Sequence, residues 1–201
     1  MLRTVASQLR PALLSLLFFT VLTGLLYPAA VTGLSQVLFP TQANGSLIFE
    51  GETPVGSELI GQLFSDPKHF WSRPSATTPQ PYNAAASNGS NLGPTNPDLE
   101  KAVAARIAAL READPGNTAP VPVDLVTASG SGLDPNISPA AASWQAPRVA
   151  RINGLKEEDV RQLVARYTED RQLGVLGEAR VNVLRLNLAL DSLVGSAPQT
   201  R

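Results

Sequence analysis

The sequence predicts an α+β fold, a mixed α/β extracytoplasmic domain anchored by one N-terminal transmembrane helix. Three observations support this prediction: a long apolar segment near the N-terminus, helical spacings that follow capping residues, and short stretches in which apolar and polar residues alternate. With 201 residues the chain has room for one domain beside its anchor, because domains commonly hold about 100 to 150 residues.

The membrane anchor is predicted over residues 11–34. No charged side chain occurs between Arg10 and Glu50, and a transmembrane helix needs about 20 mostly apolar residues. A cleaved signal peptide is the alternative, and YPAAVTG would supply its cleavage site. We favour a retained anchor because the apolar region is longer than a signal core of about 7 to 15 residues. Pro28 is expected to kink this helix.

The charges around the anchor predict its orientation. Arg3 and Arg10 precede the apolar segment, whereas Glu50 is the first charged residue after it. Basic residues are retained on the cytoplasmic side of a membrane. Residues 1–10 are therefore expected in the cytoplasm and residues 35–193 outside it, as in a single-pass protein of a bacterial inner membrane.

Two small residues are candidates for helix packing within the membrane. Thr20 and Gly24 lie four residues apart and so share one face of the predicted helix. Small residues let a second transmembrane helix approach closely, and contact with lipid alone is the alternative for this face.

The first half of the domain is expected to begin with a strand over residues 46–50 and to contain one amphipathic helix. Asn96 and Pro97 are typical of the N-cap and the first position of a helix. The sequence Asp-Pro-Gly at residues 114–116 is expected to end this helix. Its apolar face recurs at helical spacing: Leu99, Val103, Ile107 and Leu110.

The middle of the domain predicts one strand and one short helix. Apolar residues alternate over residues 121–128, which favours a strand. Ser138 followed by Pro139 predicts a helix start. Pro147 is expected to interrupt this helix, because proline lacks the N–H that an internal helical position donates.

The C-terminal part predicts a further helix, then a second strand. The helix is expected to begin near Leu155 and to end before Gly174. Its apolar face would hold Val160, Leu163, Val164 and Tyr167. Residues 179–190 favour a strand, although the leucines from Leu184 onward fit a helix equally well. Residues 194–201 are predicted to form a disordered tail.

The composition excludes several classes of function. The net charge of −1 provides no basic surface for nucleic acid. The chain has no cysteine and one histidine, so thiolate metal sites are excluded and the scattered carboxylates form no cluster of metal ligands. We therefore expect no metal, no resident cofactor and no nucleic-acid partner on this chain.

The polar stretch VTASGSGLDPNISP, residues 126–139, contains Ser, Gly and Asp, residue types that also occur in catalytic and phosphate-binding loops. It lacks the glycine and lysine spacing of a phosphate-binding loop and the flanking glycines of a nucleophile elbow. His69 could complete a triad with residues in or near this stretch: Ser129 or Ser131, with Asp124 or Asp134. We favour a packing or surface role for His69, and we predict no catalytic residue.

Six segments form a recognisable set when they are taken in order: GSELIGQLF (56–64), FWSRPSA (70–76), YNAAASNGSNLGPTNP (82–97), PVDLVTASGSGLDPNISPAAA (122–142), RVAR (148–151) and LGEARVNVLRLNLAL (176–190). With the anchor, they resemble the C subunit of the Kdp potassium-transporting P-type ATPase as far as about Leu193. The family tends to have tyrosine at His69 and glycine at Asn88, so neither residue receives a family role.

The resemblance implies a non-catalytic accessory subunit of a high-affinity, ATP-driven potassium uptake pump. Its partners would be a channel-like potassium-binding subunit and a P-type pump subunit, with a small single-helix subunit beside them and membrane lipid around the anchor. The phosphorylated aspartate belongs to the pump subunit, and DKTGT does not occur here. K+, ATP and Mg2+ are therefore expected to bind at the level of the complex.

The family's proposed roles are assembly, stabilisation of the complex, and an influence on ATP affinity or potassium entry. A domain outside the cytoplasm would lie across the membrane from ATP. An influence on ATP affinity would then have to pass through the membrane helices or the channel-like subunit. A membrane-anchored extracytoplasmic hydrolase and a solute-binding module remain the alternative classes.

Three residues are candidates for contacts with other subunits: Arg73, Asn91 and Asp134. Each combines hydrogen-bonding capacity with a neighbouring Pro or Gly that constrains the backbone. The alternative is that all three stabilise their own loops. Four carboxylates are candidates for attracting cations, unless they are ordinary solvated or turn-capping groups: Glu58, Asp66, Asp124 and Asp134.

Overall fold

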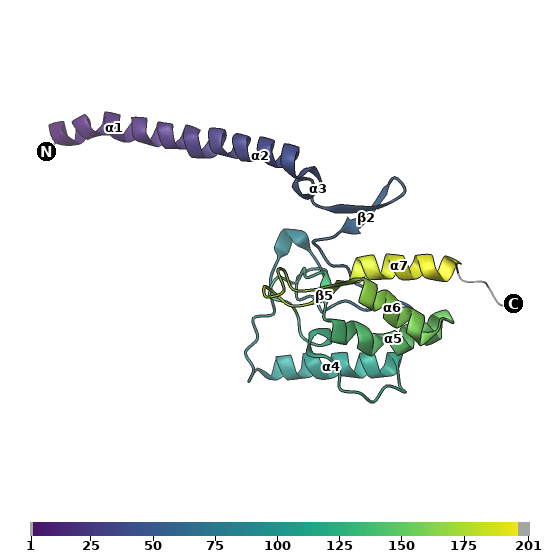
Figure 1. The fold of residues 1–201 in the computed structure, drawn as a ribbon. Coiled ribbons are helices and arrows are strands. Elements are labelled where there is room, and N and C mark those ends of the chain that lie inside the picture. Colours follow the sequence, from purple (N-terminus) through teal and green to yellow (C-terminus); the bar gives the residue numbers. More distant parts are fainter. Residues whose placement is uncertain (1, 197–201) are drawn as a thin grey trace. The chain divides into compact units, whose positions relative to one another are not determined.

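The structure is a computed structural model that describes residues 2–196, without the side chains of residues 2–6 and 196. The chain divides into two compact units, Met1–Leu47 and Ile48–Arg201, and each is described by itself. Figure 1 shows helices and short strands together in the second unit. The predicted mixture of helices and strands is confirmed.

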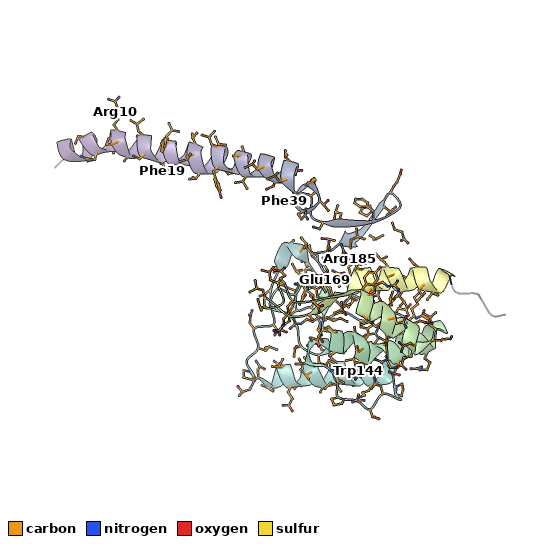
Figure 2. All side chains as sticks on the ribbon, in the orientation of Figure 1. Arg10, Phe19, Phe39, Trp144, Glu169 and Arg185 are labelled. Carbon is orange, nitrogen blue, oxygen red and sulfur yellow. The ribbon has the colours of Figure 1, made fainter. Side chains whose placement is uncertain are left out.

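The N-terminal unit is one long helical segment. Helix α1 (Leu2–Val21), the π-helical turn η1 (Leu22–Leu26) and helix α2 (Tyr27–Leu38) follow one another directly. Residues Ser7–Leu38 include an 18-residue window with a mean hydropathy of 1.9 and are long and apolar enough to cross a membrane. Their side chains, such as Phe19 in Figure 2, project from the helix on all sides. The helix is therefore longer than the span predicted over residues 11–34.

Pro28 does not interrupt this helix. Proline has no N–H and so cannot donate to the carbonyl four residues earlier, which is that of Gly24. In the preceding turn the Tyr27 N–H donates instead to the Leu22 carbonyl, five residues back. The proline predicted as a kink is thus accommodated by a π-helical turn, a common way to absorb such a defect.

The C-terminal unit contains two small sheets and four helices of more than two turns. Strands β1 (Leu47–Glu50) and β2 (Thr53–Ser57) pair with each other. Strand β5 (Arg180–Asn182) lies between β3 (Asn136–Ile137) and β4 (Thr168–Glu169), antiparallel to both. The four helices are α4 (Pro97–Ala113), α5 (Pro139–Asn153), α6 (Glu157–Arg166) and α7 (Val183–Ser196).

Two helices agree closely with their sequence patterns. The Asn96 side chain accepts a hydrogen bond from the Asp98 N–H at 2.9 Å and caps α4. On α6, Val160, Leu163 and Val164 are buried in the core, as their spacing predicts. α5 packs against α6, and α6 packs against α7, so these helices enclose the main apolar core.

The strand predicted over residues 121–128 is wrong. The segment forms a 3-10 turn, η3 (Val123–Leu125), and Leu125 and Val126 are both buried. Consecutive burial is incompatible with a half-exposed strand, in which side chains alternate between two faces. Pro120 and Pro122 also lack the N–H groups that a strand ladder uses.

The predicted interruption at Pro147 is also wrong, because α5 continues through it to Asn153. Ser138 caps this helix as expected, accepting a hydrogen bond from the Ala141 N–H at 3.0 Å. The neighbours Ala146, Arg148 and Val149 are buried, and this packing outweighs the hydrogen bond that proline removes. The helix ends at Gly154, which has a left-handed conformation with φ 66°.

The open question at residues 179–190 is resolved as a strand followed by a helix. β5 ends at Asn182, whose side chain accepts a hydrogen bond from the Arg185 N–H at 3.1 Å and so caps α7. The buried positions Val183, Leu186 and Leu190 have helical spacing. α7 includes residues 194–196 of the predicted tail, because Val194 packs against the core. Residues 197–201 lie outside the described part of the chain.

The long segment between β2 and α4, residues 58–96, contains a single 3-10 turn, η2 (Ala84–Ala86). Part of its backbone is bound by Arg148, a residue of α5 that is 1% exposed. The guanidinium donates to the Pro67 carbonyl and, at 3.1 Å, to the His69 carbonyl. It also lies 5.0 Å from the centroid of the Trp71 ring. Burial lowers the Arg148 pKa to about 10.

Two buried amides continue this pattern. Gln145 accepts from the Trp71 N–H at 2.8 Å and donates to the Trp71 carbonyl at 3.2 Å. Asn187 of α7 accepts from the Phe70 N–H at 2.9 Å and donates to the Phe70 carbonyl at 3.0 Å. Each amide thus satisfies one residue's backbone as a neighbouring strand would. We call Arg148, Gln145 and Asn187 the backbone clamp.

We predict that Arg148→Ala lowers the free energy of unfolding by about 3 kcal/mol, because buried carbonyls lose a charged donor and a cavity remains. Denaturant unfolding of the full-length protein in detergent measures the change. Arg161→Ala on the exposed face of α6 is the matched control and should cost about 0.5 kcal/mol. Equal losses in the two variants would contradict the role of the backbone clamp.

Candidate functional site

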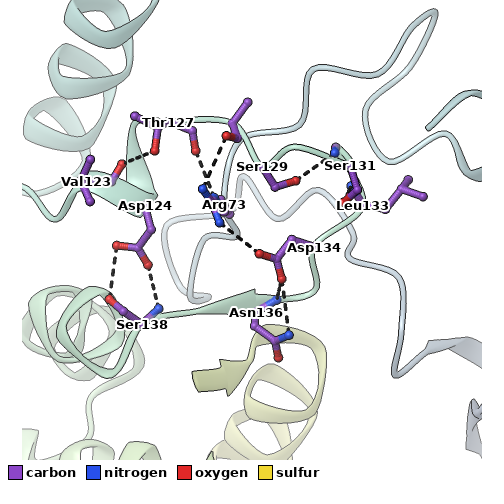
Figure 3. A network of polar contacts seen from close by, with 12 residues as sticks. Arg73, Val123, Asp124, Thr127, Ser129, Ser131, Leu133, Asp134, Asn136 and Ser138 are labelled. Atoms are coloured by element: carbon purple, nitrogen blue, oxygen red, sulfur yellow. Dashed lines mark hydrogen bonds and ion pairs between the residues drawn. The ribbon is translucent and has the colours of Figure 1, made fainter. Parts of the chain in front are cut away.

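Two of the three predicted interaction residues contact each other. The Arg73 guanidinium lies 3.1 Å from the Asp134 carboxylate, and both side chains are 29% exposed. Arg73 comes from the irregular segment before α4, whereas Asp134 lies two residues before the start of β3. Figure 3 shows this ion pair at the centre of a polar network. We call the loop of residues 126–135 the central loop.

The remaining hydrogen bonds of this pair also lie within the domain. Arg73 Nε donates to the Thr127 carbonyl at 3.2 Å, and Nη2 lies 3.5 Å from the Ala128 carbonyl oxygen. Asp134 Oδ1 accepts from the Asn136 N–H at 3.0 Å, which caps the turn into β3. The ion pair therefore fastens the central loop to the segment that carries Arg73.

The serines of the central loop have turn-forming roles. Ser129 Oγ accepts from the Gly132 N–H at 2.9 Å, and Ser131 Oγ accepts from the Leu133 N–H at 3.1 Å. His69 Nε2 lies 2.9 Å from a carboxylate oxygen of Asp191 on α7. The structure thus pairs His69 with α7 rather than with a serine of this loop, and these described residues form no Ser-His-Asp geometry that supports acyl transfer.

Asp124, the other aspartate considered for a triad, supports a helix start. Its carboxylate accepts from the Ser138 N–H at 2.7 Å and from the Ser138 hydroxyl at 3.2 Å. Because Ser138 is the N-cap of α5, Asp124 holds that cap in place. Figure 3 shows Asp124 directed at Ser138 rather than at Arg73.

Two glycine-containing loops pack backbone against backbone. The Asn88 N–H donates to the Ser131 carbonyl at 3.0 Å. A Cβ atom added to Gly89 would lie 2.9 Å from the Gly130 carbonyl oxygen, and one added to Gly132 would lie 2.6 Å from the Asn88 carbonyl oxygen. Glycine is therefore required for this close approach. Gly89 and Gly132, one from each loop, are accounted for by this contact.

Asn91 does not join the ion pair. Its side chain donates to Asn88 Oδ1 at 3.2 Å and to the Gly89 carbonyl at 3.3 Å. Its φ of +53° is one that asparagine tolerates better than most residues. The hydrogen bonds of Asn91 thus stay inside its own loop, residues 87–93.

Tyr82 helps to connect the segment that carries Arg73 and Ser75 to the central loop. Its hydroxyl donates to the Arg73 carbonyl, and its N–H donates to Ser75 Oγ at 2.9 Å. The Ser75 hydroxyl in turn donates to the Gly132 carbonyl at 2.7 Å. Burial raises the pKa of Tyr82 to about 12, because the phenolate would be poorly solvated there.

An open cavity of about 440 Å³ borders the ion pair. Its polar lining mixes both signs of charge: Arg73, Asp124, Asp134, Glu178 and Arg180. Within residues 2–196, no group of three or more His, Cys, Asp or Glu side chains could hold a metal ion. The cavity combines these charged groups with apolar side chains such as Val123 and Ile137, and it has no arrangement suited to metal catalysis.

The remaining carboxylates proposed to attract cations have cationic neighbours. Glu58 lies 2.7 Å from Arg185, and Asp66 lies 3.6 Å from Lys68. The hydrogen bond from the Lys68 N–H, together with the lysine charge, lowers the pKa of Asp66. These pairs favour the alternative given above, that these carboxylates are ordinary solvated or turn-capping groups.

In the N-terminal unit, Thr20 lies in α1 and Gly24 in η1, and both are exposed. A Cβ atom added to Gly24 would meet no atom within 4 Å. This face is therefore open to a second helix or to lipid.

Sequence reasoning missed two features. The backbone clamp has a weak signal, namely polar residues at helical spacing among buried alanines in α5. The hairpin loop between β4 and β5, residues 170–179, carries exposed apolar residues between two glycines. The apolar residues among the glycines of this turn were the sequence feature from which its exposed apolar tip could have been predicted.

Comparison with known proteins gives one consistent result. Residues 9–192 match the family model KdpC, described as K+-transporting ATPase, c chain. A potassium-transporting ATPase KdpC subunit of Polaromonas naphthalenivorans is 69% identical over 92% of this chain and 94% of its own length. The subunit of the same name from Methylococcus capsulatus is 66% identical over 93% of this chain and 98% of its own length.

We predict that, relative to a Tyr82→Phe variant, the protein loses stability as the pH rises from 10 towards 12, because the pKa of Tyr82 is raised to about 12. A group whose pKa is raised by folding contributes its full stabilisation when the pH is below its pKa in the unfolded chain. This stabilisation is lost as the pH rises from there to its pKa in the folded protein. Tyr82→Phe should remove the pH dependence that the Tyr82 hydroxyl causes. At neutral pH it should lower the free energy of unfolding by about 1 kcal/mol, because the hydrogen bond to the Arg73 carbonyl is lost. Denaturant unfolding at about pH 8 and about pH 11 measures both effects. Equal losses in wild type and variant between these pH values would contradict the prediction.

Proposed function

This chain belongs to the KdpC family of K+-transporting ATPase subunits, and we propose that it joins a channel-like potassium-binding subunit to a P-type pump subunit. The observation that carries the proposal is the match to one subunit family along residues 9–192, which include both the apolar helix and the domain. The relatives of the same name extend over nearly the whole chain.

The domain is proposed to act by binding rather than by catalysis. Its most polar region, around the central loop, uses its ionisable groups in internal contacts: Arg73 with Asp134, and Asp124 with Ser138. The hydrolase alternative finds no support, since His69 pairs with Asp191. K+, ATP and Mg2+ are accordingly assigned to the other subunits, and an influence on ATP affinity would be transmitted through the membrane helices.

We further propose that the N-terminus lies in the cytoplasm and the domain outside the inner membrane. The support is that Arg3 and Arg10 precede the uncharged stretch of residues 11–49. The helix face of Thr20 and Gly24 is proposed to contact a helix of a partner subunit, with a small single-helix subunit and lipid as further neighbours.

The first experiment is purification of the tagged full-length protein in mild detergent from potassium-starved cells, followed by identification of its partners by mass spectrometry. We expect the channel-like and pump subunits to be recovered with it. Recovery of the protein alone, from membranes shown to contain the other subunits, would refute the proposal.

Arg73, Asn91 and Asp134 are tested in the same experiment. Their proposed role is contact with a partner, so alanine variants should recover less of the other subunits than their loss of stability explains. Arg161→Ala, on α6, is the control. Loss of the ion pair between Arg73 and Asp134 should itself lower the free energy of unfolding by about 1 kcal/mol. If partner recovery falls no further than this loss of stability explains, the residues stabilise their own loops and do not contact a partner.

The orientation is tested by cysteine labelling, because the chain has no cysteine of its own. Val123→Cys places a thiol at a site that is 69% exposed on the domain, and Gln8→Cys places one on the N-terminal side of Arg10 and of the predicted span of residues 11–34. A membrane-impermeant maleimide added to intact spheroplasts should label Cys at position 123 alone. Labelling of position 8 in sealed spheroplasts would reverse the proposed orientation.

A further inference from the structure

We propose that the hairpin loop of residues 170–179 is a hydrophobic plug that inserts into an apolar socket on a neighbouring subunit of the transport complex. This inference rests on the proposed function, because it requires that the chain assembles with other subunits. It adds a specific contact, which lies outside the polar network around Arg73.

Three large apolar side chains project from this loop into solvent. Leu173 is 91% exposed, Val175 is 72% exposed and Leu176 is 56% exposed. Most other exposed large apolar residues belong to the membrane-type helix, so this group of three is a distinct feature of the domain. Clustered exposed apolar side chains mark contact sites more often than isolated ones do.

The loop is ordered by its own contacts. The backbones of Gln172 and Leu176 exchange two hydrogen bonds of 2.9 Å, and the Val175 N–H donates to the Gln172 carbonyl at 3.2 Å. Arg171 pairs with Glu178 at 2.5 Å, closing the base of the turn. The apolar side chains are thus presented on a fixed backbone, which reduces the entropy lost on binding.

The tip has a backbone conformation that does not suit leucine. Leu173 has φ +53° and Gly174 has φ +76°, so both central residues of this turn have positive φ. Turns of that kind strongly favour Asn-Gly, because a leucine side chain is strained in the left-handed region. Leucine at this position opposes hairpin stability and is exposed, which points to a role in contact rather than in folding.

The charges near the tip favour a protein over a lipid surface as the occupant. Glu169 pairs with Arg180 at 2.9 Å, and Arg171 pairs with Glu178. With Asp170, the segment of residues 169–180 has three acidic and two basic side chains, a net charge of −1. Attachment to an anionic bilayer uses a basic excess and interfacial Trp or Tyr, neither of which this segment has. Apolar side chains between paired charges fit the core and rim of a protein interface.

Single cysteines test the contact in the complete complex. Leu173→Cys should react with maleimide at least about tenfold more slowly in the purified complex than in the full-length chain alone, as expected for a desolvated interface core. Leu63→Cys is the matched control, because Leu63 is a leucine of the domain that is 66% exposed. Position 63 should label at similar rates in both states.

Three outcomes would overturn the inference. Equal labelling of position 173 in the complex and alone would show that the loop stays free. Protection of the chain alone in vesicles of phosphatidylethanolamine and phosphatidylglycerol would assign the tip to lipid. Protection of the chain alone that increases with its concentration in detergent would assign it to a second copy.

An asparagine variant separates assembly from folding. Leu173→Asn creates the favoured Asn-Gly turn, so the thermal midpoint of the chain alone should stay equal or rise. Its affinity for the other subunits should fall by about tenfold or more, because one buried leucine is lost. Leu63→Asn should assemble normally. Normal assembly of Leu173→Asn would refute the hydrophobic plug and leave the proposed function intact. Failure of the wild-type chain to assemble would refute the proposed function.

Discussion

The domain depends on hydrogen bonds between buried side chains and the backbone of a segment that has no sheet of its own. Residues 58–96 contain one short turn of regular structure, yet their peptide groups enter the core near Phe70, which is fully buried. Unpaired buried peptide groups are costly. Arg148, Gln145 and Asn187 supply the missing partners from two helices. The positions of Arg73 and the loops that follow it are set by this arrangement.

The same principle explains why the polar loops are poor candidates for catalysis. Gly132 and Gly89 allow two loops to approach until their backbones touch, and Arg73 donates to two carbonyls of the central loop while it pairs with Asp134. In the sequence these polar side chains could bind a ligand or substrate, but in the structure their hydrogen bonds are made to other residues of the domain. Apolar surfaces such as the tip at Leu173 and the membrane-type helix are open to partners as well.

Local patterns predicted helix starts well, and of the predicted strands the one at residues 46–50 is confirmed as β1 whereas the one at residues 121–128 is wrong. The caps Asn96 and Ser138 and the apolar face of α6 follow from neighbouring residues, so the sequence was sufficient for them. The strands have between two and five residues each, too short for alternation to be recognised. Residues 121–128 were misassigned because their burial is set by packing. The pairing of Arg73 with Asp134, 61 residues apart, could not be read from spacing at all.

The backbone clamp also determines when the domain can form during biosynthesis. Phe70 and Asn187 are 117 residues apart in the chain, and Arg148 is 79 residues from His69. The segment around Phe70 therefore stays without its Asn187 partner until α7 has been synthesised. Such long-range contacts form late. The domain is accordingly expected to complete its folding only after α7 has been synthesised.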